Sequence, residues 1–272
     1  MHPSPCNPAR GAADDLERIR SRAPLVLSLT NSVVQPLTAN LLLAVGAVAA
    51  MLNDPQEAAE MIHGGAQALL INLGTLTRSQ GKAMLAAVQA ANEAGIPWVL
   101  DPVAVGALSL RTHLAMILKE QKPKIIRGNA SEIRALAGHP ARTRGPESTC
   151  SSAEALEAAA LLARETGAVV LVTGRIDYAT DGIRTFSIEN GHALMSRMTG
   201  TGCSMGALAA ACATVSPTPL QAAVSTAVLM GLAGEWAFSR SSRPGTFAAA
   251  LLDAMDAIDR GYVLKHAHAA AL

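Results

Sequence analysis

A glycine-rich turn that leads directly into a run of small residues carries the clearest chemical signal in the sequence. Residues 198–213 read MTGTGCSMGALAAACA, with Gly200 and Gly202 close together and Cys203 directly after them. Glycines let the backbone approach a ligand closely, and the first N–H groups of a helix have no partner within that helix. Such a turn favours a bound anion, for example a phosphoryl group. The same residues also suit a plain strand-to-helix turn in which Cys203 is a small buried hydrophobe.

Two carboxylates are candidates for holding Mg²⁺ near this anion site. Asp101 ends an apolar segment, and Glu132 lies one turn into a helix that begins after Asn129. Mg²⁺ binds oxygen ligands, commonly one or two carboxylates together with water and phosphate oxygens. Both residues also have a structural interpretation, because Asp101 can cap a loop and Asn129 with Glu132 has the spacing of a capping box.

Arg127 and Thr173 are candidate contacts for a nucleotide. The guanidinium fork of Arg127 suits a phosphate, although a structural pair with a carboxylate would use the same side chain. Thr173 and Gly174 end the segment VVLVT and offer a hydroxyl and an open backbone, or they are ordinary turn residues. Together with an anion site and Mg²⁺ ligands, these residues describe phosphoryl transfer. No Walker A motif and no protein-kinase signature occurs in the sequence, so a different scaffold would hold the nucleotide.

Alternating strand and helix patterns must position these residues. Strands are predicted at residues 25–29, 68–73, 98–101, 124–127 and 168–173, and helices at residues 33–45, after Asp54–Pro55, at 78–94 and at 153–165. This alternation predicts a mainly parallel sheet with helices on both faces. Ligands bind beyond the carboxyl ends of such strands, and Asn31, Asn72, Asp101, Arg127 and Thr173 fall there.

The second half of the chain changes pattern. Residues 176–190 alternate polar and apolar side chains around Asp181–Gly182, which predicts an antiparallel hairpin at the sheet edge. Helices are predicted at residues 201–215, 220–238 and 247–258, and they form a helical C-terminal region. We expect residues 21–272 to form one domain, residues 1–20 to be partly loose, and residues 139–150 to be a surface loop.

The composition narrows the class of protein. Apolar residues make up 50% of the 272 residues, and the net charge is +1, which argues against a nucleic-acid or anionic-membrane partner. The four cysteines show neither zinc spacing nor a disulfide framework. The N-terminus lacks the apolar segment of a signal peptide, and polar residues interrupt the most apolar late stretch. These features predict a cytoplasmic protein whose partners are small molecules or other subunits.

Several segments resemble the hydroxyethylthiazole kinase family, which belongs to the ribokinase-like superfamily. In family order they are TNSVVQPLTANLLLAVGA from Thr30, VLDPVAVGA from Val99, IIRGNASEI from Ile125, VLVTG from Val170 and TGTGCSMGALAA from Thr199. The third and fifth segments are the specific ones. The resemblance implies a three-layer α/β/α fold. It also implies ATP-dependent phosphorylation of the primary alcohol of 4-methyl-5-(2-hydroxyethyl)thiazole, a step of thiamine biosynthesis and salvage.

The resemblance also implies roles for individual residues. ATP would contact Arg127 and Thr173, the thiazole would contact Met51, Gly200 and Asn31, and Mg²⁺ would be organised by Asp101 and Glu132. Most superfamily members have an aspartate general base where this chain has Cys203. The thiol would then position the alcohol or accept its proton, while the amides at Gly200 and Gly202 stabilise the transferred group. The family resemblance further implies a homotrimer with the substrate site between subunits.

Three other functions compete with this interpretation. A kinase of another small alcohol, such as a hydroxymethylpyrimidine, would use the same scaffold, but an aspartate in place of Cys203 would favour it. A nucleotide- or thiazole-binding protein without turnover would keep the same pocket. Covalent catalysis by Cys203 would need a histidine base. His192 precedes the glycine turn by several residues, but we interpret it as a surface residue of the hairpin.

Overall fold

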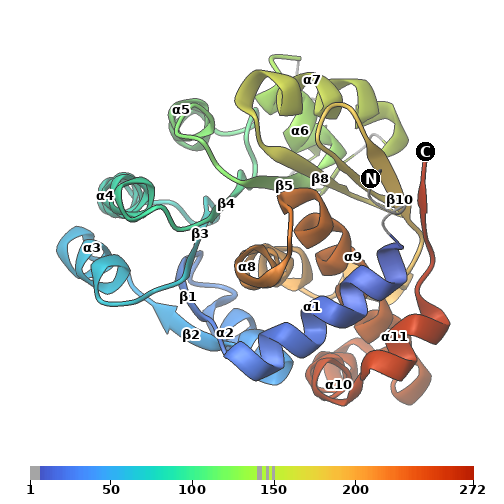
Figure 1. The fold of residues 1–272 in the computed structure, drawn as a ribbon. Helices are drawn as coiled ribbons and strands as arrows, with labels where there is room; N and C mark the ends of the chain where they lie inside the picture. Colours follow the sequence, from blue (N-terminus) through green and yellow to red (C-terminus); the bar gives the residue numbers. More distant parts are fainter. Residues whose placement is uncertain (1–6, 140–142, 145–146, 149–150) are drawn as a thin grey trace, which may run out of the picture.

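The computed structural model describes residues 7–139, 143–144, 147–148 and 151–272. Its main feature is a nine-stranded sheet with the strand order β11-β10-β9-β8-β5-β4-β3-β1-β2 (Figure 1). The strands are β1 Leu25–Leu29, β2 Val48–Met51, β3 Ala68–Asn72, β4 Trp98–Asp101, β5 Ile125–Asn129, β8 Val169–Thr173, β9 Asp177–Thr180, β10 Thr185–Ile188 and β11 Ala269–Ala271. In the sheet, β2, β1, β3, β4, β5 and β8 pair in parallel, whereas β9, β10 and β11 pair antiparallel. The mainly parallel sheet and the β9–β10 hairpin are thus confirmed, but the hairpin is not at the edge, because β11 pairs outside β10.

Helices cover both faces of this sheet. They are α1 Pro8–Arg22, α2 Gln35–Val45, α3 Pro55–His63, α4 Arg78–Ala94, α5 Ser109–Lys119, α6 Ala130–Leu136, α7 Leu156–Thr166, α8 Thr201–Val215, α9 Pro219–Arg240, α10 Pro244–Ala257 and α11 Arg260–His266, with short 3-10 helices η1 Ala153–Ala155 and η2 Ala193–Arg197. One apolar cluster joins the sheet to α3–α7 and a second joins it to α1, α2 and α8–α11. The resulting three layers match the predicted α/β/α arrangement.

The central strands β3 and β4 are apolar up to their last residue because both of their faces are covered. Every residue of β3 is buried, and β4 is buried in the same way. Strands of parallel sheets have such continuous apolar runs because helices lie above and below them. The side chains that carry chemistry are therefore confined to the strand ends.

Small side chains bring α8 and α9 into the centre of their layer. Residues 207–211 of α8 are fully buried, and four of these five are alanines. Small residues allow short distances between packed elements. In the described residues α9 is the helix long and apolar enough to cross a membrane, but 78% of its apolar window is packed inside the protein. Its composition is thus explained by its place in the core.

The N-terminal helix α1 corrects one expectation. Residues 1–20 were expected to be partly loose, but residues 8–20 belong to α1, while residues 1–6 lie outside the described part of the chain. Asn7 caps this helix, and Ala12, Leu16 and Ile19 are buried against the core. These three residues have helical spacing in the sequence. Alanine is only weakly apolar, however, so the buried face of this charged helix gives a weak amphipathic pattern.

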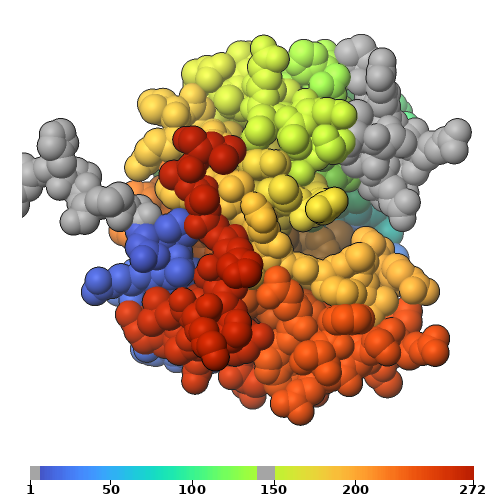
Figure 2. Space-filling model, turned by 90° about the vertical axis from the view of Figure 1, so that its right-hand side faces the viewer, coloured from blue at the N-terminus to red at the C-terminus, as the bar shows by residue number. Residues whose placement is uncertain are grey.

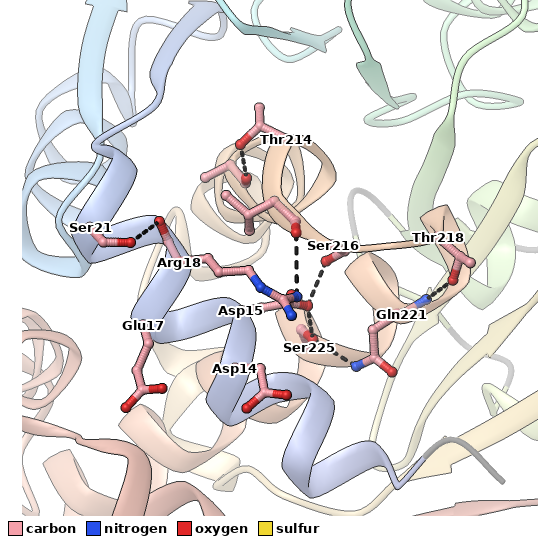
Figure 3. A network of polar contacts seen from close by, with 12 residues as sticks. Asp14, Asp15, Glu17, Arg18, Ser21, Thr214, Ser216, Thr218, Gln221 and Ser225 are labelled. Carbon is pink, nitrogen blue, oxygen red and sulfur yellow. Dashed lines mark hydrogen bonds and ion pairs between the residues drawn. The ribbon is translucent and has the colours of Figure 1, made fainter. Parts of the chain in front are cut away.

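A buried carboxylate attaches α1 to the helices behind it (Figure 3). Asp15 is fully buried, and its Oδ2 accepts hydrogen bonds from the hydroxyls of Ser216, at 2.5 Å, and Ser225, at 2.6 Å. Arg18 donates to Oδ1 from the next turn of α1, at 3.1 Å. Because buried polar groups need partners, this network fixes the position of α1 on α8 and α9.

Other elements were not predicted. These are β2, α5, α11 and β11, which are short or lie in segments of weak periodicity. Most of the expected surface loop at residues 139–150 lies outside the described residues, which there include the short pair β6 Thr143–Arg144 and β7 Glu147–Ser148. The C-terminal strand β11 pairs with β10, and the red C-terminal segment crosses the face shown in Figure 2.

We predict that Asp15→Ala destabilises the protein by about 2–4 kcal/mol, because it leaves buried hydroxyls without their acceptor. Urea unfolding followed by circular dichroism would measure the change. The matched control is Asp14→Ala on the same helix, which removes a part-exposed ion pair with Arg260 and should cost less than about 1 kcal/mol. Equal losses in the two variants would contradict the role assigned to the Asp15 network.

Candidate active site

Polar side chains from neighbouring strands form a continuous row at the carboxyl edge of the sheet. Asn31 follows β1, Asn72 ends β3, Asp101 ends β4, Arg127 lies in β5 and Thr173 ends β8. In the sheet order β1-β3-β4-β5-β8 these strands are neighbours, and Asn72 is in register with Asp101. The structure therefore brings these five predicted residues to one edge of the sheet.

Hydrogen bonds connect the row from one side to the other. Asn31 Nδ2 donates to Asn72 Oδ1 at 3.0 Å, and Asn72 Nδ2 donates to Asp101 Oδ2 at 2.7 Å. The same Asp101 oxygen lies 3.6 Å from Arg127 Nη1, and Arg127 Nη2 donates to Thr173 Oγ1 at 2.8 Å. The alternative of a structural arginine–carboxylate pair is thus present in the structure, and it sets the direction of the Arg127 fork.

The glycine turn places the start of α8 directly over this row. Gly200 has a φ of +97°, a conformation that suits glycine, and a Cβ there would lie 2.8 Å from Val34 Cγ1. A Cβ on Gly202 would lie 2.7 Å from Arg127 Nη2. No side chain caps the N-terminus of α8 among the described residues. The first amides of α8 and the guanidinium of Arg127 therefore offer donors to an anion at one place.

Cys203 stands beside the polar row. Its Sγ accepts a hydrogen bond from Asn31 Nδ2 at 3.3 Å, and the side chain is half-buried. Burial raises the pKa of the Cys203 thiol to about 11, and the nearby Asp101 acts in the same direction. The thiol is consequently neutral near pH 7, which makes it a weak proton acceptor and a suitable hydrogen-bonding partner for an alcohol.

Asp101 is the most unusual group of the site. It is fully buried, its Oδ1 has no hydrogen-bond partner among the described atoms, and burial raises its pKa to about 7 against the opposing effect of Arg127. A buried carboxylate oxygen without a partner is costly unless a cation or donor joins it. Asp101 is thus a fitting oxygen donor for Mg²⁺.

Glu132 has the structural role that the sequence left open. Its Oε2 accepts a hydrogen bond from the Asn129 amide, and its Oε1 accepts one from the Ala104 amide, each at 2.9 Å. Asn129 in turn caps α6, so the capping box is formed. No cluster of three or more His, Cys, Asp or Glu side chains suited to a metal ion occurs in the described part of the chain. Mg²⁺ often binds only one or two protein carboxylates, and phosphates and water supply its other ligands. Asp101 and Glu132 therefore suffice as the protein ligands of such an ion.

Met51 lies at the carboxyl end of β2, on the strand next to β1. It pairs in register with Ser28 of β1 and is half-buried. Its predicted role toward the thiazole remains a prediction. The neighbouring Asn31, by contrast, is in direct contact with Cys203.

A cavity of about 500 Å³ adjoins the row, and Arg127, Thr173 and Gly202 line it. This volume is in the usual range for small-molecule sites. Asp177 and His192 also line it, although the sequence did not indicate that they would. Asp177 lines the cavity from the start of β9, and its Oδ1 accepts a hydrogen bond from the Gly174 amide at 2.9 Å.

His192 corrects a second expectation. It does not belong to the β9–β10 hairpin but directly precedes η2. Its Nδ1 accepts a hydrogen bond from the Leu194 amide at 3.1 Å, and the residue lines the cavity. The signal in the sequence that His192 could lie near the site was its short distance along the chain from the glycine turn. Sequence periodicity could not show that the chain folds back over the cavity at this point.

The raised pKa of Cys203 makes a direct prediction about its reactivity. Because the thiolate is the reacting species, alkylation by iodoacetamide at pH 7.5 should be roughly 100-fold slower than for an unperturbed thiol, and the rate should rise up to about pH 11. Mass spectrometry of the peptide that contains Cys203 would follow the reaction. A half-maximal rate below pH 9 would contradict the predicted neutral thiol.

Comparison with known proteins places this site in a family. Residues 16–260 match the sequence model of the hydroxyethylthiazole kinase family. The chain is 69% identical to the hydroxyethylthiazole kinase of Akkermansia muciniphila over 253 residues, covering 93% of each protein. It is 52% identical to that of Cronobacter sakazakii over 246 residues, covering 90% of this chain and 92% of the relative.

Solved structures agree with this relationship. The hydroxyethylthiazole kinase of Pyrococcus horikoshii OT3 superposes with a TM-score of 0.88 at 38% identity, over 96% of this chain and 98% of that chain. A pyridoxal kinase of Staphylococcus aureus has a TM-score of 0.64 at 15% identity, over 92% of this chain and 98% of that chain, and so shares the fold. The chain with the polar row and the glycine turn therefore belongs to the hydroxyethylthiazole kinase family.

Proposed function

We propose that this protein transfers the γ-phosphoryl group of ATP to the primary alcohol of 4-methyl-5-(2-hydroxyethyl)thiazole, for thiamine biosynthesis or salvage. The observation that carries the proposal is the meeting of the uncapped α8 N-terminus and Arg127 at one cavity, with Cys203 of α8 in contact with Asn31 of the polar row. The family membership supports both the reaction class and the acceptor. Residues 21–272 act as one kinase domain in this proposal.

The transferred phosphoryl group would lie between α8 and Arg127. The amides of residues 200–203 and the guanidinium of Arg127 neutralise charge on its oxygens, and Thr173 holds the guanidinium in place. Because the transition state of phosphoryl transfer is loose, such positioning and charge neutralisation supply most of the catalysis. Gly202 keeps the space beside the guanidinium free of a side chain, and Gly200 lets the turn pack against Val34 and Leu37.

Cys203 positions the alcohol rather than acting as a strong base. Its thiol is neutral near pH 7, and Asn31 fixes the sulfur from the side of β1. In a loose transition state the attacking oxygen forms little bond to phosphorus, so it loses its proton late and needs no strong base. This account explains why a cysteine can stand where an aspartate would be a stronger proton acceptor.

Mg²⁺ would be held by Asp101 and, through water, by Glu132. The unpartnered Oδ1 of Asp101 fits direct or water-mediated binding, whereas both Glu132 oxygens already accept backbone hydrogen bonds. When bound, the ion neutralises charge on the ATP phosphates. On the protein side, the other Asp101 oxygen accepts a hydrogen bond from Asn72 and pairs with Arg127.

A homotrimer with the thiazole site between subunits is part of this proposal, as is a cytoplasmic location. The edge strand β2 ends at Met51, and the exposed apolar side chains of Val33, Leu43 and Val48 lie on or near that edge. A second copy that covered them would bring Met51 and Gly200 to a shared thiazole site. Light scattering that gives the mass of a single chain would contradict the trimer.

Release of ADP by the purified protein with Mg-ATP tests the function. Hydroxyethylthiazole, hydroxymethylpyrimidine and a simple sugar would be compared as acceptors. Release that depends on the thiazole supports the proposal, whereas release with the pyrimidine alone keeps the kinase and replaces the acceptor. If ATP binds but no acceptor causes ADP release, the protein is a binding protein without turnover.

We predict that Cys203→Ala lowers kcat at least tenfold and changes the Kd for ATP less than twofold, because the thiol contacts the acceptor and not the nucleotide. Steady-state kinetics and calorimetry would measure the two quantities. Cys212→Ala is the matched control, since Cys212 is buried on the same helix away from the site. An unchanged kcat for Cys203→Ala would exclude the assigned role.

We predict that Arg127→Ala raises the Kd for ATP roughly 10- to 100-fold, the loss expected for charge-assisted hydrogen bonds to a phosphate. Calorimetric titration measures this effect, and thermal unfolding checks that the variant is folded, because Asp101 loses its partner. Arg184→Ala is the control, since Arg184 pairs with Asp181 at the exposed hairpin. Wild-type affinity in Arg127→Ala would remove Arg127 from the ATP site.

A further inference from the structure

Two groups of residues in the lining of the cavity differ in chemistry, and each is called a wall here. Arg127, Thr173 and Gly202 form a polar wall from β5, β8 and the start of α8. The thioether side chains of Met195, Met205 and Met230 contribute a second wall from η2, α8 and α9. A nucleoside triphosphate has the same division between its charged phosphates and its flat, largely apolar base. The second wall is therefore the part of the cavity that suits a base.

His192 joins this second wall with an orientation that other residues determine. Its ring stacks on Phe238 of α9, with a distance of 3.6 Å between ring centroids and an interplanar angle of 15°. Its Nδ1 accepts the Leu194 amide at 3.1 Å. The imidazole is thus held by a ring contact and a hydrogen bond, and it lines the cavity as a fixed planar group.

The loop that carries His192 is attached firmly to α9. The amide of Gly191 donates to Glu235 Oε1 at 2.8 Å. Asn190 Nδ2 donates to the same carboxylate at 3.1 Å and to the His266 carbonyl at 2.9 Å. A Cβ on Gly231 would lie 2.6 Å from Asn190, so the loop packs directly on the helix backbone. The wall is formed before a ligand arrives, which lowers the entropic cost of binding.

From these contacts we propose that His192 is the stacking platform for the nucleobase of ATP. The base would lie on the imidazole face that Phe238 leaves uncovered, beside the methionine side chains, while the phosphates extend toward Arg127 and the start of α8. Aromatic rings and thioethers both pack favourably on a purine. The inference rests on the proposed function in one respect, that a nucleoside triphosphate is the phosphoryl donor.

Calorimetric titration with Mg-ATP and with Mg-tripolyphosphate tests the platform, because tripolyphosphate lacks the base. His192→Ala should raise the Kd for ATP about tenfold, the usual effect of losing one base–aromatic stack. The Kd for tripolyphosphate should change less than twofold. His192→Phe should stay within about threefold of wild type for ATP, which separates stacking from the hydrogen bond to Leu194.

His113→Ala is the matched control, since His113 is an exposed histidine on α5 on the other face of the sheet. An unchanged Kd for ATP in His192→Ala overturns the proposal. An equal loss of affinity for ATP and tripolyphosphate also overturns it, because the residue would then act through the loop and not through the base. ATP binding that responds to His192→Ala in a protein that phosphorylates no thiazole supports the platform and contradicts the proposed acceptor.

Discussion

The buried ion pair between Asp101 and Arg127 is the interaction on which the site depends. Both side chains are almost completely removed from water, with exposed fractions of 0% and 11%. Burying two charges is costly unless their hydrogen-bonding groups are also satisfied. Asn72 supplies a donor to Asp101 and Thr173 an acceptor to Arg127, so the row across four strands holds the pair in one geometry. Among the described atoms, Asp101 Oδ1 and Arg127 Nε still have no hydrogen-bond partner, so the pair is only partly satisfied.

The helix above this pair is built to approach it. Gly202 leaves room for the guanidinium, and a Cβ on Gly206 would lie only 3.4 Å from Asp101 Oδ2. The alanines that follow pack against the sheet and α9, so the same helix that needs glycines at its start has small residues along its length. Close approach puts the positive end of α8 beside Arg127, and this concentrates donors where a phosphoryl group would lie.

The electrostatics of the site favour positioning over proton abstraction. The Cys203 thiol is neutral near pH 7, and the carboxylate that could serve as a base is paired with an arginine. Phosphoryl transfer tolerates this arrangement because its barrier depends mainly on charge neutralisation and alignment. Membership of the hydroxyethylthiazole kinase family is consistent with a site of this type.

The sequence by itself determined the parts that depend on local patterns. The bounds of β1, β4, α4 and α8 match the predicted ranges, since hydrophobic runs, caps and glycines are local signals. The same signals placed polar residues at strand ends, and a parallel sheet necessarily brings those ends to one edge. Two interpretations of Glu132 stayed open in the sequence, because the Asn129–Glu132 spacing favours a capping box while the same carboxylate could also reach a metal ion.

Only the tertiary structure decided which distant groups meet. The contact of Asn31 with Cys203 joins residues 172 positions apart, and that of Ser216 with Asp15 joins residues 201 positions apart. No periodicity encodes such pairs, so the packing of α1 and the turn of His192 into the cavity wall were missed. Local propensity acts over a few residues, whereas burial, ion pairing and cavity shape arise when remote segments pack together.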